Sequence, residues 1–322
     1  MNRRHILAIT IAAVVLTACT QTGGLGPVPT SPPTAVPSEP AGPDLTPPPS
    51  VAPSQSPTPT ESPAATPGTP TATPAPTPTP VETIIVRTYG VLPGDVGVEG
   101  LVPTLQVVPE TPAVARAAME ELLAGNLAAG VSSAIPDGTR LLGLSIRDGI
   151  ATVDLSSEFE TGGGSASSFY RLGQVVYTLT QFSTVGAVLF QVEGRTVTTF
   201  GPEGIVLEGS LNRAAFEDLL PSVFVDRPAF GAAIGNPARV AGNANVFEAT
   251  FMITILDGSG RVLAEGPAMA TCGTGCRGTF DVTVPYSVGS AQWGTLRVWV
   301  SSARDGLPED VRDYPVWLTP AA

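Results

Sequence analysis

The sequence predicts a disordered N-terminal tether, then an α+β domain, then an all-β sandwich. Three observations indicate this order. A long segment rich in Pro, Thr and Ser follows the first 20 residues and holds 20 of the chain's 34 prolines. Two helical patterns then occur between strand patterns, and the last 90 or so residues show only short strand patterns separated by turns.

The N-terminus has the features of an export signal. Arg3 and Arg4 precede an apolar run, Ile6 to Ala18, which is too short to span a bilayer but fits a signal-peptide core. The run ends in LTAC, which resembles the lipobox of bacterial lipoproteins. An ordinary secretory signal with an incidental cysteine is the alternative. We expect residues 1–18 to be removed, Cys19 to be lipidated, and the chain to be extracytoplasmic and anchored to the membrane by acyl chains.

The segment from residue 20 to about residue 80 contains Pro, Thr, Ser, Ala and Gly with only three charged residues. It has too few apolar side chains to offset the entropy lost on ordering. We expect an extended, polyproline-like spacer that holds the folded part away from the membrane.

Composition excludes several classes of function. The chain has no lysine, and without the signal peptide 14 arginines face 28 acidic residues, a net charge near −14. This balance argues against nucleic acid as a partner, since nucleic-acid binding needs basic surface. The only histidine, His5, lies in the signal peptide. Without histidine the mature chain cannot form a Ser-His-Asp or Cys-His catalytic set or a histidine-containing zinc site.

The first folded region alternates strands and helices. Residues 84–92 read as a strand, and Thr111 and Pro112 predict the start of a helix that Gly125 ends. A second helix is predicted at 167–182, and strands follow in VGAVLFQV and RTVTTF. The predicted order is β-α-β-β-α-β, a small sheet with two helices.

The sharpest local signal is LLGLSIRDGIATVDL, two strands joined by a type I′ turn at Asp148-Gly149. This turn pairs Arg147 with Ile150. It therefore places three apolar pairs on one face: Leu142 with Leu155, Leu144 with Val153, and Ile146 with Ala151.

Between residues 84 and 200 the chain resembles the GerMN domain of bacterial sporulation and germination lipoproteins. The matching motifs are Leu122–Gly125, Ile135–Thr139, Asp148-Gly149, Val153–Leu155 and Thr178–Gln181. GerMN domains resemble ring-building modules of envelope-spanning complexes. The resemblance therefore implies protein interaction rather than catalysis.

The last region predicts a β-sandwich. In VFEATFMITILD, Phe247, Phe251 and Ile253 lie on the apolar side of an alternating strand, and five or six more short strands follow. This region resembles the immunoglobulin-like domain of bacterial spore germination in Asn236–Val240, Gly242–Ala244, Phe247–Ala249 and Gly278–Phe280. The expected domains are 1–18 (signal peptide), 19–82 (lipidated cysteine and disordered linker), 83–226 (GerMN) and 229–320 (immunoglobulin-like).

The stretch CGTGC contains Cys272 and Cys276 and completes a G-x-G-x-x-G pattern. A phosphate loop would need a helix after it, a metal site lacks ligands, and redox pairs usually have two residues between the cysteines. Outside the membrane, two thiols this close should be oxidised, so we predict a disulfide.

The sequence offers no catalytic residue, metal site or cofactor site, and an enzyme is not expected. Five aromatic residues gather in the second domain and could form its core, which we favour, or a ligand surface: Tyr286, Trp293, Trp299, Tyr314 and Trp317. The leading hypothesis is a non-catalytic lipoprotein that mediates protein interaction or assembly in the cell envelope. The alternative is a lipoprotein that binds cell-wall glycan or a small ligand.

Overall fold

The computed structural model describes residues 82–94 and 99–321, which fall within one compact unit spanning Ala75–Ala322. The predicted signal peptide, Cys19 and the tether up to residue 81 lie outside the described residues. Among the helices that the structure describes, none is both long enough and apolar enough to span a bilayer.

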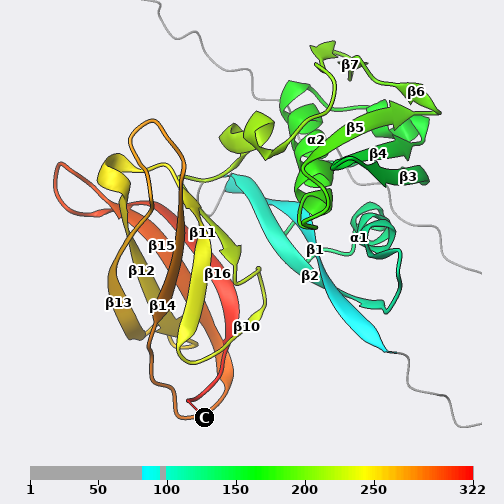
Figure 1. Cartoon of the computed structure of the whole chain (residues 1–322). Helices are drawn as coiled ribbons and strands as arrows, with labels where there is room; N and C mark the ends of the chain where they lie inside the picture. Colours follow the sequence, from blue (N-terminus) through cyan, green and yellow to red (C-terminus); the bar gives the residue numbers. More distant parts are fainter. Residues whose placement is uncertain (1–81, 95–98, 322) are drawn as a thin grey trace, which may run out of the picture. The chain divides into compact units, whose positions relative to one another are not determined.

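The first domain contains a long hairpin, two helices and a four-stranded sheet (Figure 1). The sheet has the order β3-β4-β5-β6, in which β4 and β5 run parallel. Its elements are β1 (Thr83–Leu92), β2 (Gly100–Pro109), α1 (Val114–Leu123), β3 (Leu141–Arg147), β4 (Ile150–Leu155), α2 (Ser165–Leu179), β5 (Ala187–Val192) and β6 (Arg195–Thr196), then the short pair β7 (Thr199–Phe200) and β8 (Ile205–Val206).

The predicted α+β class is confirmed, but strands β2 and β8 were missed, and the predicted strand RTVTTF is divided into β6 and β7. β2 was not predicted, and β1 pairs with it along its whole length instead of joining the sheet. Pro103 obscures β2 in the sequence, because proline normally argues against a paired strand. Helix α1 starts two residues later than Thr111 and Pro112 predicted, although the Thr111 hydroxyl still accepts a hydrogen bond from the Ala113 N–H at 3.1 Å.

The predicted hairpin is present as β3–β4. Asp148 and Gly149 have φ values of 51° and 79°, as a type I′ turn requires, and the expected pairs up to Gly143–Asp154 are observed. The pairing of Leu142 with Leu155 is wrong. A bulge at Leu142 brings Leu141 opposite Leu155 and leaves Leu142 exposed.

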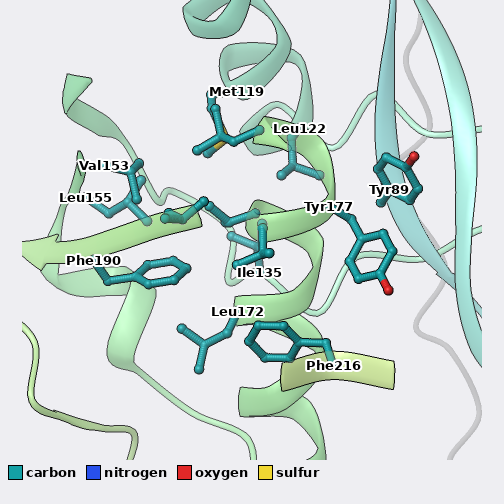
Figure 2. Close-up of a cluster of buried hydrophobic side chains, with 14 of the residues drawn as sticks. Tyr89, Met119, Leu122, Ile135, Val153, Leu155, Leu172, Tyr177, Phe190 and Phe216 are labelled. Carbon is teal, nitrogen blue, oxygen red and sulfur yellow. The ribbon is translucent and has the colours of Figure 1, made fainter. Parts of the chain in front are cut away.

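Helix α2 supplies the centre of the first core. Leu172, Val176 and Leu179 are fully buried, at the helical spacing predicted. Gly173 allows close packing, since a Cβ there would lie 2.8 Å from Leu219 Cδ1. Figure 2 shows Leu122 from α1, Tyr177 from α2 and Tyr89 from β1 in this core.

The second domain is an all-β sandwich, as predicted. A five-stranded sheet, β10-β16-β15-β12-β13, and a three-stranded sheet, β14-β11-β9, share one apolar core. The strands are β9 (Val223–Arg227), β10 (Ala233–Ile234), β11 (Ala238–Ala244), β12 (Thr250–Asp257), β13 (Val262–Met269), β14 (Gly278–Val284), β15 (Gln292–Ser301) and β16 (Pro308–Leu318).

Two details of the second domain differ from the sequence-based expectation. Strand β9 pairs with β11, so residues 223–226, which the predicted boundary at 226 assigned to the first domain, are part of a strand that is hydrogen-bonded into the second. Phe247 is 64% exposed rather than buried, because a 3-10 turn at Phe247–Ala249 interrupts the alternation before β12 begins.

Candidate interaction surface

The β1–β2 hairpin packs into both domains. Leu101 lies in the first core and its neighbour Val102 in the second, both fully buried. The Pro103 carbonyl accepts a hydrogen bond from the Phe230 N–H at 2.8 Å. The Pro103 nitrogen, which carries no hydrogen, lies on the same side of β2 as this carbonyl, so it faces the second domain and β1 loses no hydrogen bond. Arg312 Nη2 also donates to the Leu101 carbonyl at 3.2 Å. The hairpin is therefore a shared element of the two domains.

Side chains of α2 and the turn after it cover the outer edge of β1. Gln181 accepts a hydrogen bond from the Arg87 N–H at 2.8 Å and donates to the Arg87 carbonyl at 2.6 Å. Thr178 accepts from the Tyr89 N–H at 3.2 Å, and Gln174 donates to the Tyr89 carbonyl at 2.8 Å. These bonds satisfy an edge that would otherwise be open to pairing. They give a physical reason for the Thr178–Gln181 motif.

A polar network lies where the domains meet. The Tyr89 hydroxyl donates to Asp226 Oδ1 at 2.5 Å, and Arg213 Nη2 donates to the Tyr89 hydroxyl at 3.3 Å and to the Tyr177 carbonyl at 3.1 Å. The guanidinium also lies 4.5 Å from the Tyr177 ring centroid. Burial raises the pKa of Tyr177 to about 12 and raises that of Tyr89 as well. Both phenols therefore stay protonated at neutral pH, and the network joins the domains.

One face of the hairpin is apolar and open. Ile85 and Val107 are cross-strand partners and are 67% and 66% exposed. The next pair on this face is Arg87 with Leu105, which is 37% exposed. We call these four residues the hairpin face. Adjacent exposed apolar side chains of this kind mark interaction sites more often than isolated ones do.

An apolar groove of about 680 Å³ adjoins the hairpin face at Leu105. Its lining includes Phe230 and Trp293 from the second domain. Trp293 is 54% exposed and packs edge-on against Trp317, with ring centroids 5.4 Å apart. The groove therefore extends the apolar surface across both domains.

The five aromatic residues of the second domain divide between core and surface. Tyr286 and Tyr314 are buried in the sandwich core, as favoured from the sequence. Trp299 is partly buried and donates from Nε1 to Thr254 Oγ1 at 3.1 Å. Trp293 is the most exposed of the five.

In the structure Cys272 and Cys276 form a disulfide with a Cα–Cα distance of 5.9 Å. The CGTGC segment joins strands β13 and β14, so it lacks the helix that a phosphate loop needs. Gly273 packs against backbone, since a Cβ there would lie 2.4 Å from the Val246 carbonyl oxygen. The Thr274 N–H donates to that carbonyl at 3.0 Å. Gly273 thus serves backbone packing, whereas Gly275 adopts a φ of 92° in the turn.

Two of the acidic residues, Asp154 and Asp257, have structural partners. Asp154 accepts a hydrogen bond from the Gly194 N–H at 2.9 Å. Asp257 accepts from the hydroxyl and N–H of Ser259 and from Arg261, and chiefly the hydroxyl hydrogen bond lowers the pKa of Asp257 to about 2. Within residues 82–94 and 99–321, no group of three or more His, Cys, Asp or Glu side chains could hold a metal ion.

Sequence reasoning missed the hairpin face. Ile85 was assigned to a strand, but nothing indicated which face that strand would bury. The usable signal was the run Ile84-Ile85-Val86, which puts apolar residues on both faces of the strand. In a two-stranded ribbon only one face packs against the helix α1, here through Val86.

Family comparisons agree with this two-domain architecture. Residues 91–198 match the model described as "Sporulation and spore germination", and residues 222–307 match "Immunoglobulin-like domain of bacterial spore germination". Neither describes an enzyme family. A comparison with curated proteins found no match.

Among solved structures, similarity is found to the first GerMN domain of the sporulation protein GerM from Bacillus subtilis, with 22% identity over 41% of this chain and 98% of that one and a TM-score of 0.35. The tandem GerMN domains of the same protein give 16% identity, 63% and 62% coverage, and a TM-score of 0.38. By its two family matches, the chain carries a domain of the sporulation and spore germination family followed by an immunoglobulin-like domain of bacterial spore germination.

Proposed function

We propose that the chain is a membrane-anchored, extracytoplasmic protein that binds a protein partner in the cell envelope during sporulation or spore germination. Both domain families carry descriptions from that biology. The observation that carries the binding role is the hairpin face, whose apolar pair Ile85 and Val107 stays about two-thirds exposed on an element that both domains hold in place.

The hairpin is suited to presenting a binding surface. Its backbone is fixed by the Gln181 hydrogen bonds on one edge and by Phe230 on the other, so partner binding need not order a loose segment. In many interfaces a few residues, most often Trp, Tyr or Arg, supply most of the binding energy, and the residues around them exclude water. On the hairpin face, Ile85, Leu105 and Val107 surround Arg87 in this way.

Replacing the apolar pair tests this role. In Ile85→Thr/Val107→Thr, the β-branched shape is kept and the apolar surface is reduced. Crosslinking in intact cells followed by affinity capture should retrieve at least about tenfold less partner, the effect of losing about 1.4 kcal/mol of binding free energy. The matched control is Val206→Thr, at a residue that is 71% exposed on β8. Equal retrieval by both variants would refute the role.

Anchoring is tested separately through Cys19. The sequence predicts acylation at this residue, so Cys19→Ser should move the chain from the membrane fraction to the extracytoplasmic soluble fraction or the medium. Mass analysis of the mature N-terminal peptide should show acyl chains. An unmodified Cys19 in membrane-bound protein would contradict the anchoring mechanism.

A second candidate function is the binding of cell-wall glycan, which the exposure of Trp293 against Trp317 favours. Exposed aromatic rings offer flat apolar faces for stacking. Under this alternative, Trp293→Ala would abolish cosedimentation with purified wall glycan, whereas Phe247→Ala, at another exposed aromatic residue, would not. Absence of cosedimentation by the unaltered chain would exclude it.

A further inference from the structure

We infer that the hairpin face and an arginine-lined pocket beside it bind an extended segment of the partner that combines apolar and acidic side chains. This inference rests on the proposed function and specifies the chemistry of the partner. It is carried by the position, charge and hydrogen bonding of two arginines, Arg87 and Arg227.

The pocket lies between the hairpin and the second domain and has a volume of about 350 Å³. Three arginines from three strands line it: Arg87 on β1, Arg227 at the end of β9, and Arg239 on β11. Leu105 and Ile234 contribute apolar walls. Guanidinium groups bind carboxylates in two-point geometry, so this lining suits an anionic group.

Two of the three arginines form no direct ion pair. Arg239 is held by Asp281, with 2.8 Å between Nε and Oδ1. Arg87 and Arg227 form no ion pair with any residue that the structure describes. This occurs in a chain where acidic residues outnumber arginines by 28 to 16. Chiefly the hydrogen bond from Arg239 lowers the pKa of Asp281, and the charge of Arg227 still helps to lower it, so Arg87 is the arginine of this pocket that has no carboxylate partner among the described residues.

Arg87 also has a donor without an acceptor. Its Nε is buried and has no hydrogen-bond partner among residues 82–94 and 99–321. A buried, unbonded donor costs free energy and calls for a specific explanation. Because Gln181 fixes both backbone groups of Arg87, the side chain projects from a defined position. An incoming carboxylate would supply an acceptor to the Arg87 guanidinium group, and contact with the covered Nε would require the groups over it to move.

The surroundings favour a peptide over a phosphate-bearing wall polymer. Arg87 shares the hairpin face with Ile85, Leu105 and Val107, and Leu105 also lines the apolar groove that contains Trp293. A phosphate polymer would use the arginines but leave this apolar surface uncovered. An extended peptide that carries acidic and apolar residues on the same face, at every second position, would use both.

The test measures fluorescence anisotropy of a rhodamine-labelled peptide, Ser-Val-Ser-Glu-Ser-Glu-Ser-Leu-Ser, with the purified full chain; its acidic and apolar residues share one face when the peptide is extended. A second probe replaces both glutamates with glutamine, and a third replaces the apolar residues with serine. We expect saturable binding of the first probe, at least about tenfold weaker binding of the other two, and a similar loss in Arg87→Gln and Arg227→Gln. Arg304→Gln, at a well-exposed arginine, is the matched control and should bind normally.

Unchanged thermal unfolding of the two pocket variants would show that they are folded, and Arg227→Gln is the safer of the two because Arg227 is exposed. Absence of binding, equal binding of the glutamate and glutamine probes, or insensitivity to both pocket variants would overturn the inference. The inference would also be overturned if millimolar inorganic phosphate displaced the peptide and purified wall polymer bound the chain more tightly than the peptide does. If the pocket fails but Ile85→Thr/Val107→Thr still loses its partner, the proposed function stands and only the partner chemistry is wrong.

Discussion

Truncation of Val102 tests whether the hairpin is a shared element of the two domains. Val102 belongs to β2 but is fully buried in the core of the sandwich. Val102→Ala removes two methyl groups, worth about 0.8 kcal/mol each, and the cavity left behind raises the expected loss of unfolding free energy to about 2–3 kcal/mol. For a protein of this size the midpoint of thermal unfolding should fall by about 4 to 12 °C.

The chain provides a separate probe for each domain. All three tryptophans, Trp293, Trp299 and Trp317, lie in the sandwich, whereas the α-helices among the described residues, α1 and α2, lie in the first domain. Tryptophan fluorescence and circular dichroism at 222 nm should therefore report different domains. We expect Val102→Ala to lower both midpoints together, and Val206→Ala to change stability by less than about 0.5 kcal/mol. An unchanged fluorescence midpoint would show that β2 does not belong to the sandwich core.

Three further predictions concern individual contacts. Gln181→Ala should lower the unfolding free energy by about 1–3 kcal/mol in urea titrations, because the Arg87 N–H and carbonyl both lose their partner; an unchanged midpoint would contradict the edge-covering role. Asp257→Asn should lower the unfolding free energy at pH 7 and make it fall less steeply as the pH drops below about 4. The lowered pKa of about 2, against 3.8 in the unfolded chain, means that the aspartate stabilises the fold above about pH 4 and loses this effect as pH falls toward 2. Equal acid sensitivity of variant and unaltered chain would refute it. In protein isolated from the cell surface, mass analysis should find the peptide that contains Cys272 and Cys276 two protons lighter before reduction than after it. A disulfide that closes a five-residue loop raises the unfolding free energy by about 2 kcal/mol. Free thiols at these positions would disprove the predicted disulfide.

Sequence patterns predicted those parts of the fold that depend on residues close together in the chain. The Asp148-Gly149 turn and the alternation around Val153 gave the β3–β4 register correctly until the bulge at Leu142, which depends on tertiary packing. Strand β2 was missed because Pro103 reads as a strand breaker, and only the position of Phe230 shows why proline is tolerated there.

The candidate surface was less accessible from sequence. Whether Ile85 is buried depends on which face of the ribbon meets α1, and the positive pocket assembles from arginines 140 or more positions apart in the chain, Arg87 with Arg227 and Arg239. Neither has a local sequence signal. The tyrosine and tryptophan residues of the sandwich likewise separate into core and surface only once the strands are paired, as Tyr314 and Trp293 illustrate.

The most direct test of the account is site-specific photo-crosslinking in intact cells. A photoreactive amino acid at Val107 lies on the hairpin face, and one at Val206 lies on an equally exposed site elsewhere. The account predicts a defined adduct with an envelope protein at Val107 that disappears in Ile85→Thr, and none at Val206. Absence of an adduct at Val107, or equal adducts at both positions, would contradict it.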